Sequence, residues 1–498
     1  MTPFGDRALR FPLPDGVPRR RLIAELSRLS GVSDVVLAED VGCVVFTDAD
    51  VDRSEVTSIL LQSNLPGKDD PFASHVIAVE YDGADLESVS SEVGRTKAEV
   101  IALHAEREYR VAMLGFLPGF AYLRGLASEL HLPRRAPRTR VPAGSVAIAA
   151  QYTGIYPYAS PGGWHLLGRA SAFDPFAAGG GHATFAIGDI VRFSPCALGS
   201  SATVTPTMGE RRARSPSGPP RAHLEVTRAA GFAILVDAGR PGRMHEGVPP
   251  GGPLVRSLFA RANEVAGNPS HACAIEVSGS IEVTARGGSV LVADDDAAVV
   301  LAEGERHVVS TAGSTRVRYL AVAGGIDAPV VLGGRGTLLV AGIGRLLRRG
   351  DCLQPDVSGG DLQAPAASVL VGPGGFAPAR EPIAIMAGPD AAGISLDALA
   401  KRSFRVGAAS DRTGTRLESV DPSALEQDVT QPKSEALTRR STPMVVGAIE
   451  QTPSGLIVLG PDHPTTGGYP VVAVVVSSSL DDFFALPIGA HLRFVVRG

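Results

Sequence analysis

Lysine is nearly absent from this chain, which restricts how it can bind anions. The 498 residues include only four lysines, Lys68, Lys97, Lys401 and Lys433, so almost all of the 47 basic residues are arginine. A bound phosphate or carboxylate would therefore be held by guanidinium or backbone N–H groups. The net charge of −5 gives no basic excess of the kind that nucleic-acid binding requires, so no nucleic-acid partner is predicted.

Membrane, secretion and disulfide signals are missing as well. The sequence contains no uncharged apolar run of about 18 residues, and its beginning does not resemble a signal peptide. The four cysteines, Cys43, Cys196, Cys273 and Cys352, are scattered and form no CxxC pair, which is typical of reduced core residues. These observations predict a cytoplasmic protein with no membrane partner.

Glycine and proline are abundant, with 58 and 38 residues, which favours turns and short strands over long helices. Apolar residues recur at helical spacing over 20–30, and 33–47 indicates two strands with a turn at Ala38–Asp40. We therefore expect a small α+β domain over residues 1–80.

Two short helices are expected next, at 85–93 and 96–108. The second begins with Thr96 and Glu99 at capping-box spacing. His104 lies on this helix one turn after Val100. A histidine in such a place is usually a core residue, although a general acid or base is the alternative.

A weak internal repeat follows. Residues 144–168 and 447–470 each contain two strands and a Gly-Gly-aromatic turn, and closing strands follow at 187–195 and 488–496. A third similar ending occurs at 348–354. The repeat predicts a mainly β (α+β) fold with three barrel-like modules.

A charged stretch rich in Pro, Gly and Ser at 208–222 is typical of an exposed linker. It divides the chain into two halves that resemble two proteins fused end to end. The expected domains are listed in chain order: 1–80, a barrel at 81–207, the linker, a first barrel of the second half at 223–360, and a second barrel at 361–498.

Three motifs of the first half combine glycine, proline, aromatic residues and arginine. Gly115, Phe116 and Gly119 lie in an irregular loop, and Arg134 and Arg138 are interleaved with prolines that pre-place their guanidinium groups. Gly162, Gly163 and the only tryptophan, Trp164, follow. The alternatives are a tight turn, a solvated charge run and a core tryptophan.

The second half has weaker signals. Asp237 and Arg240 lie among alternating glycines and prolines in 236–252. No Walker sequence occurs, so ATP would be bound without a P-loop. The triplet Asp294–Asp296 favours a charged hairpin over a metal site, and no metal site is predicted.

Long segments of both halves resemble the allophanate hydrolase subunit 1 and subunit 2 family, whose members include 5-oxoprolinase subunits. The first half carries the resemblance in GFLPGFAYL, LPRRAPRTRVPAGSVAIA and GIYPYASPGGWHLLGR. The second half carries it in VDAGRPGRMHEGVPPGG, SDRTGTRLES and TTGGYPVVAVV. The resemblance implies cyclophilin-like β-barrels with a cleft between the halves.

The resemblance also implies a function. The first implied reading is an ATP-dependent 5-oxoprolinase component that uses ATP, with Mg, to open 5-oxo-L-proline and acts with a separate third subunit. The second is the carboxyltransferase module of a urea carboxylase, although no methionine here is followed by the lysine that carries biotin, so biotin is not attached to this chain. A non-catalytic histidine-kinase inhibitor is the third, and a homo-oligomer stays open.

The family resemblance also implies roles for individual residues at matching positions. The resemblance implies catalytic roles for His104, Arg138, Asp237, Asp411 and Arg412, with His104 and Asp411 as proton carriers. The motifs and the resemblance together predict binding of substrate or ATP at Gly115, Phe116, Gly119, Arg134, Ser145, Gly162, Gly163, Trp164, Arg240, Asn263, Glu276 and Arg416. The rigid loops of both halves are expected to direct these guanidinium groups into one shared cavity.

The second half departs from the family pattern at several positions. Asp462-His463-Pro464-Thr465 stands where the family has Asp-Arg-Gln-Thr. Ile449-Glu450-Gln451-Thr452 stands in place of Ile-Gln-Val-Pro. Gly251-Gly252-Pro253-Leu254-Val255 stands in place of Ser-Gly-Ala-Met-Asp. Together these departures remove hydroxyl, carboxylate and guanidinium groups of the family pattern.

Overall fold

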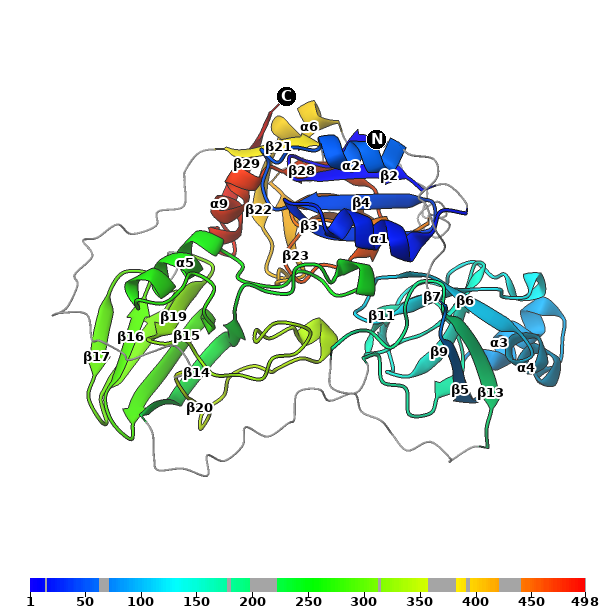
Figure 1. Cartoon of the computed structure of the whole chain (residues 1–498), viewed down its shortest axis with the longest axis horizontal. Helices are drawn as coiled ribbons and strands as arrows, with labels where there is room; N and C mark the ends of the chain where they lie inside the picture. The colour runs from blue at the N-terminus through cyan, green and yellow to red at the C-terminus, as the bar shows by residue number, and fades with distance from the viewer. Residues whose placement is uncertain are drawn as a thin grey trace.

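The computed structural model describes residues 1–13, 16–61, 71–176, 181–197, 222–311, 315–356, 382–390, 395–420 and 440–497. These residues form an N-terminal sheet with helices, two closed barrels and an open sheet. Figure 1 shows the N-terminal sheet beside the second barrel, with the first barrel and the open sheet on opposite sides of them. The predicted mainly β (α+β) class with an N-terminal α+β unit is confirmed.

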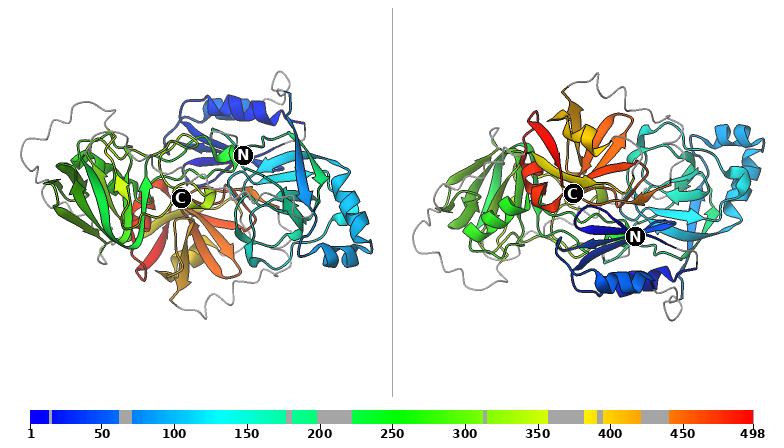
Figure 2. Two further views of the ribbon diagram at one scale, coloured as in Figure 1. Left: turned by 90° about the horizontal axis from the view of Figure 1, so that it is seen from below. Right: turned by 90° about the horizontal axis from the view of Figure 1, so that it is seen from above.

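The N-terminal unit is an antiparallel sheet in the order β1-β2-β4-β3, with two helices on its outer face (Figure 2). Its elements are β1 (Thr2–Pro3), β2 (Ala8–Pro12), α1 (Arg19–Ser27), β3 (Val32–Leu37), β4 (Val41–Phe46) and α2 (Ser54–Leu61). The helix α1 buries Leu22, Ile23 and Leu26, which recur within one turn. The strand pair expected over 33–47 is confirmed as β3 and β4.

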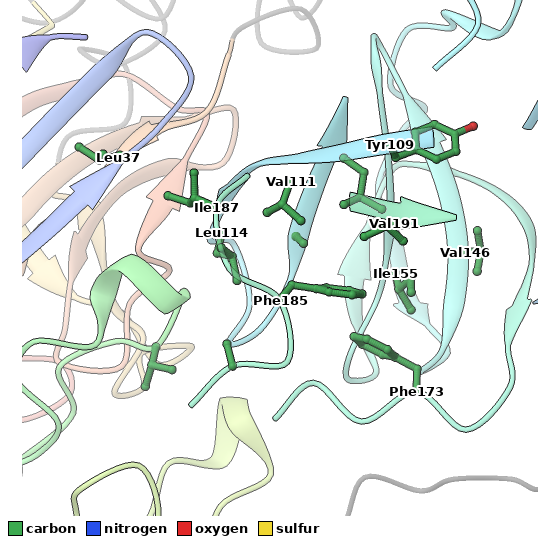
Figure 3. Close-up of a cluster of buried hydrophobic side chains, with 14 of the residues drawn as sticks. Leu37, Tyr109, Val111, Leu114, Val146, Ile155, Phe173, Phe185, Ile187 and Val191 are labelled. Carbon is green, nitrogen blue, oxygen red and sulfur yellow. The ribbon is translucent and has the colours of Figure 1, made fainter. Parts of the chain in front are cut away.

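The first barrel closes seven strands in the order β10-β7-β6-β13-β5-β12-β9. The strands are β5 (Ser74–Glu80), β6 (Glu108–Leu114), β7 (Ala121–Arg124), β9 (Ser145–Ala149), β10 (Tyr152–Ile155), β12 (His165–Ala170) and β13 (Ile190–Pro195). The expected domain boundary at residue 80 is wrong, because β5 pairs with β12 and β13 of this barrel. The barrel core includes Val111, Val146, Ile155 and Val191 (Figure 3).

Smaller elements surround the first barrel. They are α3 (Leu86–Val93), α4 (Lys97–Ala105), the 3-10 turn η1 (Ser128–Leu130) and the strand pair β8 (Arg138–Val141) and β11 (Ser160–Gly162). Both expected helices are confirmed. The capping box of α4 is present, because Thr96 and Glu99 each bond the other's backbone N–H.

The second barrel repeats the first. Its strands are β21 (Ile383–Ala387), β22 (Ser403–Val406), β23 (Gly414–Ser419), β25 (Ala448–Thr452), β26 (Gly455–Leu459), β28 (Val471–Val475) and β29 (His491–Val496). Their order, β21-β28-β25-β26-β23-β22-β29, reproduces that of the first barrel, and β29 pairs in parallel with β21 as β13 does with β5. The additional elements are β24 (Thr442–Pro443), β27 (Thr466–Gly467), α6 (Leu396–Ala400), η4 (Ser477–Ser479) and α9 (Leu480–Ala485). The structure thus confirms the internal repeat.

The third predicted barrel is an open sheet. Its strands are β14 (His223–Val236), β15 (Ala274–Arg286), β16 (Val290–Asp294), β17 (Ala298–Leu301), β18 (Arg306–Ser310), β19 (Arg318–Val322) and β20 (Cys352–Leu353), with α5 (Arg256–Val265), η2 (Met244–Glu246) and η3 (Leu339–Ala341). The expectation of a barrel at 223–360 is wrong, because β17 and β20 lie at opposite ends of the strand order and, in the part of the chain that is described, do not pair with each other. The predicted linker, 208–222, lies outside the described residues except for Ala222.

Two further expectations concern helices and cysteines. None of the described helices is long and apolar enough to cross a membrane. All four cysteines are free thiols, and Cys43 and Cys273 are buried as predicted. Cys352 is exposed, contrary to the core prediction, because β20 lies at the sheet edge.

The two halves interlock instead of sitting end to end. The N-terminal sheet packs on the second barrel, where Phe4 and Ala8 share a core with Val445 and Val474. Arg10 forms an ion pair of 3.1 Å with Asp390, and Asp6 accepts hydrogen bonds from the backbone and hydroxyl of Ser477. The first sixty residues are therefore held by the C-terminal barrel.

Candidate functional site

The segment 237–255 connects β14 to α5 and contacts both barrels. Towards the first barrel, the N–H of Gly119 donates to the carbonyl of Glu246 at 3.3 Å. Towards the second barrel, the N–H of Gly251 donates to the carbonyl of Pro461 at 2.9 Å. The glycine-rich motifs predicted in the two halves therefore meet at this segment.

Gly115 marks how closely the two halves approach each other. A Cβ at this position would lie 2.1 Å from Oγ1 of Thr466, a separation that no real Cβ adopts. Any side chain here would force the halves apart. Phe116 follows with φ of 67°, a strained conformation for a residue other than glycine. The loop thus serves as a close contact between halves.

A cavity of about 430 Å³ lies where the N-terminal sheet, the segment 237–255 and the second barrel come together. Its size is within the usual range for small-molecule sites. Much of its wall is apolar, from Phe4, Ala8, Val45, Met244, Phe259, Val445, Val474 and Val475. Its polar groups include Arg7, Asp34, Arg256 and His463.

His463 is the deepest of these polar groups, with no exposure to solvent. Its Nδ1 lies 2.8 Å from the carbonyl of Pro464, so Nδ1 carries the proton. Nε2 has no hydrogen-bond partner among the described residues. Burial lowers the pKa of His463 to about 4, which keeps the ring neutral at pH 7 and leaves Nε2 as a hydrogen-bond acceptor.

Arg7 and Arg256 both line this cavity and a smaller one next to it. Arg7 donates to the carbonyls of Phe46 and Thr47. The guanidinium group of Arg256 has no partner within the described ranges. Desolvation and the neighbouring charge of Arg7 lower the pKa of Arg256, the carboxylate of Asp481 opposes this shift, and the residue itself is exposed. Two positive charges therefore lie close together at a partly apolar space.

The carboxylates near these arginines are already engaged by other groups. Asp481 accepts the backbone N–H groups of Arg256 and Ser257 at 2.9 and 2.8 Å. Asp34 accepts the N–H of Met244 at 3.0 Å, and burial raises its pKa to about 6. Hydrogen-bonded carboxylates keep their negative charge, so Asp34 and Asp481, together with Asp6 on the cavity wall, offset the charge of the two arginines.

A buried charge network borders the cavity and joins the open sheet to the second barrel. Arg412 donates to both carboxylate oxygens of Asp462 at 2.9 Å and to Glu276 at 2.6 Å. It also donates to the carbonyl of Gly252 at 2.5 Å. Glu276 further accepts the hydroxyl of Tyr319 and the N–H of Leu254. Each of these charged groups has its partners, which is the arrangement of a structural crosslink.

Asp237 and Arg240 hold a neighbouring loop in place. Arg240 is buried, and its guanidinium group donates to the carbonyls of Val331 and Gly336 at 3.0 and 2.6 Å. Asp237 accepts the N–H groups of Gly239 and Arg335 at 2.9 and 2.6 Å. Both side chains thus support the cavity wall, while their neighbours Ala238 and Pro241 line it.

One of the two predicted arginines of the first half, Arg138, pairs with Asp85, as does the neighbouring Arg135. Oδ1 of Asp85 accepts Arg138 at 2.5 Å and Arg135 at 2.7 Å. Arg134, by contrast, makes no ion pair with any described residue. The exposed Arg140 on the adjoining strand also has none among these residues. Of the two arginines predicted here, Arg134 is therefore the one without an ion pair among the described residues.

The glycines beside this cluster are packed against protein. A Cβ on Gly162 would meet the hydroxyl of Tyr156, and one on Gly163 would meet the carbonyl of Arg135. Trp164 is buried edge-on against Phe120 and Tyr122, as its core alternative predicts. Ser145 is buried, and its hydroxyl donates to the carbonyl of Pro142 at 2.8 Å.

His104 is a core residue, not a residue of a cleft. Its Nδ1 lies 2.8 Å from the hydroxyl of Tyr81, and its Nε2 lies 2.8 Å from that of Thr153. The ring stacks on Phe193, and burial lowers its pKa to about 3. A fully enclosed ring with both nitrogens bonded has no path to a substrate proton, so the structure contradicts the proton-carrier prediction.

Three other predicted residues lie apart from the cavity. Asn263 is buried in α5 and bonds the carbonyl of Ala272 and the side chain of Asn268. Asp411 is exposed and accepts the N–H groups of Thr413 and Gly414, which closes a turn. Arg416 is exposed on β23. None of these side chains lines the cavity.

The acidic triplet surrounds an arginine. Arg318 lies 3.5, 2.9 and 2.6 Å from Asp294, Asp295 and Asp296. The triplet lies at the end of β16, where the chain turns back to β17. This agrees with the expectation of a charged hairpin.

The predicted cavity of converging guanidinium groups is therefore not formed by the predicted arginines. The loops of the two halves do meet, but Arg138, Arg240 and Arg412 are bonded within the protein. The cavity uses Arg7, Arg256 and His463 instead, and none of the three was predicted as a site residue. The signal for His463 was its place in a departure from the family pattern.

Comparison with known proteins identifies the family. The model for the carboxyltransferase domain, subdomains C and D, matches residues 2–179, and that for subdomains A and B matches residues 246–496. The second match covers half of the chain, so the chain belongs to the carboxyltransferase-domain family and carries both parts in one polypeptide.

Individual relatives match the two halves separately. Residues of the first half are 49% identical to the 5-oxoprolinase B subunit of Escherichia coli O157:H7 over 125 residues, 24% of this chain and 56% of that relative. The 5-oxoprolinase C subunit of Escherichia coli K12 is 28% identical over 297 residues, 55% of this chain and 90% of that relative. The urea amidolyase of Lachancea kluyveri is 26% identical over 307 residues, 55% of this chain but 17% of that relative.

A solved structure matches the whole chain. The crystal structure of TTHA0988 is 28% identical, with a TM-score of 0.83, and the match covers 98% of this chain and 100% of that one. The interlocked arrangement of both halves thus has a counterpart of the same extent. By contrast, the sequence match to the 5-oxoprolinase B subunit covers only 56% of that relative from Escherichia coli O157:H7.

Proposed function

We propose that the chain is a component of an ATP-dependent lactam hydrolase of the 5-oxoprolinase type, acting with a separate third subunit. The overall reaction would convert 5-oxo-L-proline, ATP and water to L-glutamate, ADP and phosphate. Support comes from the relatives, since the first half resembles the B subunit of 5-oxoprolinase and the second half resembles its C subunit.

The main structural support for the proposal is that both halves of the chain supply residues to the cavity wall. Arg7 and Asp34 come from the first half of the chain, while Arg256 and His463 come from the second. A site built by both halves explains why they occur together, because neither half encloses the cavity alone. Fusion into one chain keeps the two halves in a one-to-one ratio and in a fixed relative position.

The chemistry requires groups that stabilise negative charge. Activation of a lactam by ATP transfers a phosphoryl group to the carbonyl oxygen, and charge develops on the phosphate oxygens. Guanidinium groups fixed in a partly dry space stabilise such charge. The cavity has two guanidinium groups on its wall, those of the half-buried Arg7 and the exposed Arg256. In the described part of the first half, Arg134 and Arg140 are further arginines without an ion pair.

The runner-up is a biotin-dependent carboxyltransferase of the urea carboxylase type. The match to urea amidolyase favours it, although this match covers only 17% of that protein. In that case carboxybiotin would arrive on another chain, because no methionine-lysine pair exists here to carry biotin.

One assay separates these functions. The purified chain is incubated with ATP and 5-oxo-L-proline, with and without the third subunit of a 5-oxoprolinase, and ADP and glutamate are measured. Glutamate formation only with the third subunit present is the expected result. Carboxylation of urea by a carboxybiotin carrier, with no ADP formed from 5-oxo-L-proline, would reject the proposal and establish the runner-up.

A further inference from the structure

His463 is a buried residue of the central cavity whose ring is only half bonded within the protein. It has no exposure to solvent, and it lines the space of about 430 Å³. Its Nε2 has no hydrogen-bond partner among the described residues. Because buried polar atoms are almost always hydrogen-bonded, such an atom beside a cavity indicates a place for a bound molecule. The hydroxyls of Thr465 and Thr466 also lack a described partner, but neither residue belongs to the cavity wall that the described residues form.

The direction of the hydrogen bond at this nitrogen is fixed by the rest of the ring. Nδ1 of His463 donates to the carbonyl of Pro464 at 2.8 Å, so Nε2 of the neutral ring can only accept. Burial lowers the pKa of His463 to about 4, which keeps the ring neutral at pH 7. The group that bonds to Nε2 must therefore carry an O–H or N–H donor.

The cavity wall near His463 is apolar. The N–H of Met444 donates to the carbonyl of Thr465 at 3.0 Å, which brings the next residue, Val445, close to the histidine. Val445 shares a buried cluster with Phe4 of the N-terminal sheet, and both side chains line the cavity. Apolar walls with a single polar group are typical of small-molecule sites. A molecule that reaches Nε2 therefore has an apolar body.

The charged groups on the cavity wall offset one another. They are Arg7, Arg256, Asp6 and Asp34. Two guanidinium groups and two carboxylates give the wall no excess of either sign, so it favours neither an anion nor a cation. Arg256 is exposed and Arg7 is half-buried, whereas His463 is fully enclosed. The part of the cavity at His463 therefore selects by hydrogen bonding and apolar contact.

From this arrangement we infer that the cavity binds an uncharged molecule with an apolar body and one O–H or N–H donor, the class of phenols and indoles. The donor bonds to Nε2 of His463, and the apolar body lies against Val445 and Phe4. This ligand differs from both substrates considered under the proposed function. The inference does not depend on that function, because it uses neither a charged ligand nor ATP.

Matched ligands test the chemical class. Phenol, toluene, benzoate and benzylammonium are titrated into the full chain at pH 7.5, and binding is measured from the NMR signals of the ligand. Toluene replaces the hydroxyl by a methyl group, and the other two add a charge of either sign. We expect phenol to bind at least about threefold more tightly than each of the others, since it alone combines a donor with a neutral body. Equal affinity for phenol and toluene, tighter binding of a charged compound, or no binding of phenol overturns the inference.

A pair of variants locates the donor. His463→Leu removes the acceptor at Nε2, so the preference for phenol over toluene should disappear while toluene still binds. His491→Leu makes the same change at an exposed histidine of β29, outside the cavity, and should keep the preference. Circular dichroism confirms that each variant is folded. A folded His463→Leu protein that still prefers phenol refutes the placement.

A third variant tests the position of the apolar body without changing the histidine. Val445→Phe fills part of the cavity and should weaken the binding of phenol and toluene alike. Unchanged affinity for both compounds would place them elsewhere and contradict the inference. The turnover assay with 5-oxo-L-proline is separate, so turnover without phenol binding rejects the inference alone, and phenol binding without turnover rejects the proposed function alone.

Discussion

The buried network around Arg412 and the central cavity lie side by side but use charge in opposite ways. In the network, Arg412 is bonded to Asp462, Glu276 and a backbone carbonyl. In the cavity, the buried Nε2 of His463 has no partner among the described residues. Complete satisfaction marks a structural crosslink, whereas a buried, unpartnered nitrogen beside a cavity can accept a hydrogen bond from a bound molecule.

The pKa values of the network show that Arg412 and its carboxylate partners stabilise each other's charges. Burial alone would lower the pKa of Arg412, but Asp462 and Glu276 outweigh it and raise that pKa well above its ordinary value. Burial raises the pKa of Asp462, and Arg412 opposes the rise. Each charge is tolerable only because the others are present.

The largest expected effect comes from breaking the network. Arg412→Met removes the positive charge and leaves two buried carboxylates facing each other. We expect the free energy of unfolding to fall by about 3–5 kcal/mol, measured by chemical denaturation at pH 7.5. Arg416→Met on the exposed face of β23 is the control and should change it by less than about 0.5 kcal/mol. A similar small loss for Arg412→Met would contradict the structural role.

His104 tests whether a satisfied histidine can still be functional. His104→Leu leaves the hydroxyls of Tyr81 and Thr153 without their histidine partner, and we expect a stability loss of about 3 kcal/mol. Because the pKa of His104 is lowered to about 3, its ring should show no titration by NMR between pH 8 and about pH 4.5. Affinity for 5-oxo-L-proline should be unchanged, and a selective loss of binding would restore His104 as a site residue.

Glu450 is a buried carboxyl group that makes no ion pair within the described part of the chain. Burial raises its pKa from 4.5 to about 7, so its contribution to stability is full below pH 4.5 and is lost as the pH rises through 7. A glutamine at this position would not titrate. The variant Glu450→Gln should therefore gain stability relative to the unchanged protein by on the order of 2 kcal/mol between about pH 5 and about pH 8. Denaturation curves at both pH values measure this, and a pH-independent difference between the two proteins would show that Glu450 is paired.

The smallest effect on stability is expected in the cavity. Arg256→Gln should change the free energy of unfolding by less than about 0.5 kcal/mol, because no described protein group loses a partner. Chemical denaturation measures the change, and a large loss of stability would place Arg256 with Arg412 as a structural residue.

Local patterns predicted most of the individual elements. The helices α1, α3 and α4, the strands β3 and β4 and the capping box at Thr96 all follow from periodicity and cap residues within a few positions. The repeat predicted three barrel-like modules, and two of them are present with the same strand order. The prediction of a third barrel was wrong, because a turn followed by a strand, as at 348–354, does not indicate whether a sheet closes.

The site was predicted less well than the fold, for a physical reason. Arg138, Arg240 and Arg412 have the residue type and spacing of an anion clamp, yet Asp85, carbonyl groups and two carboxylates already bind them. Which partner reaches a guanidinium group depends on contacts between residues far apart in the chain, 53 positions for Arg138 and 136 for Arg412 with Glu276. No local pattern contains that information.

The sequence by itself determined the class of the fold, the repeat of two barrels and the membership of both halves in one family. Those properties depend on residue spacing within short segments and on motifs that stay contiguous. Only the tertiary structure decided that the N-terminal sheet packs on the C-terminal barrel and that Arg7, Arg256 and His463 share a cavity. Burial and hydrogen-bond partners are set by tertiary packing. Whether a charged side chain is bonded within the protein or free to bind a ligand is therefore decided only when the two halves are packed together.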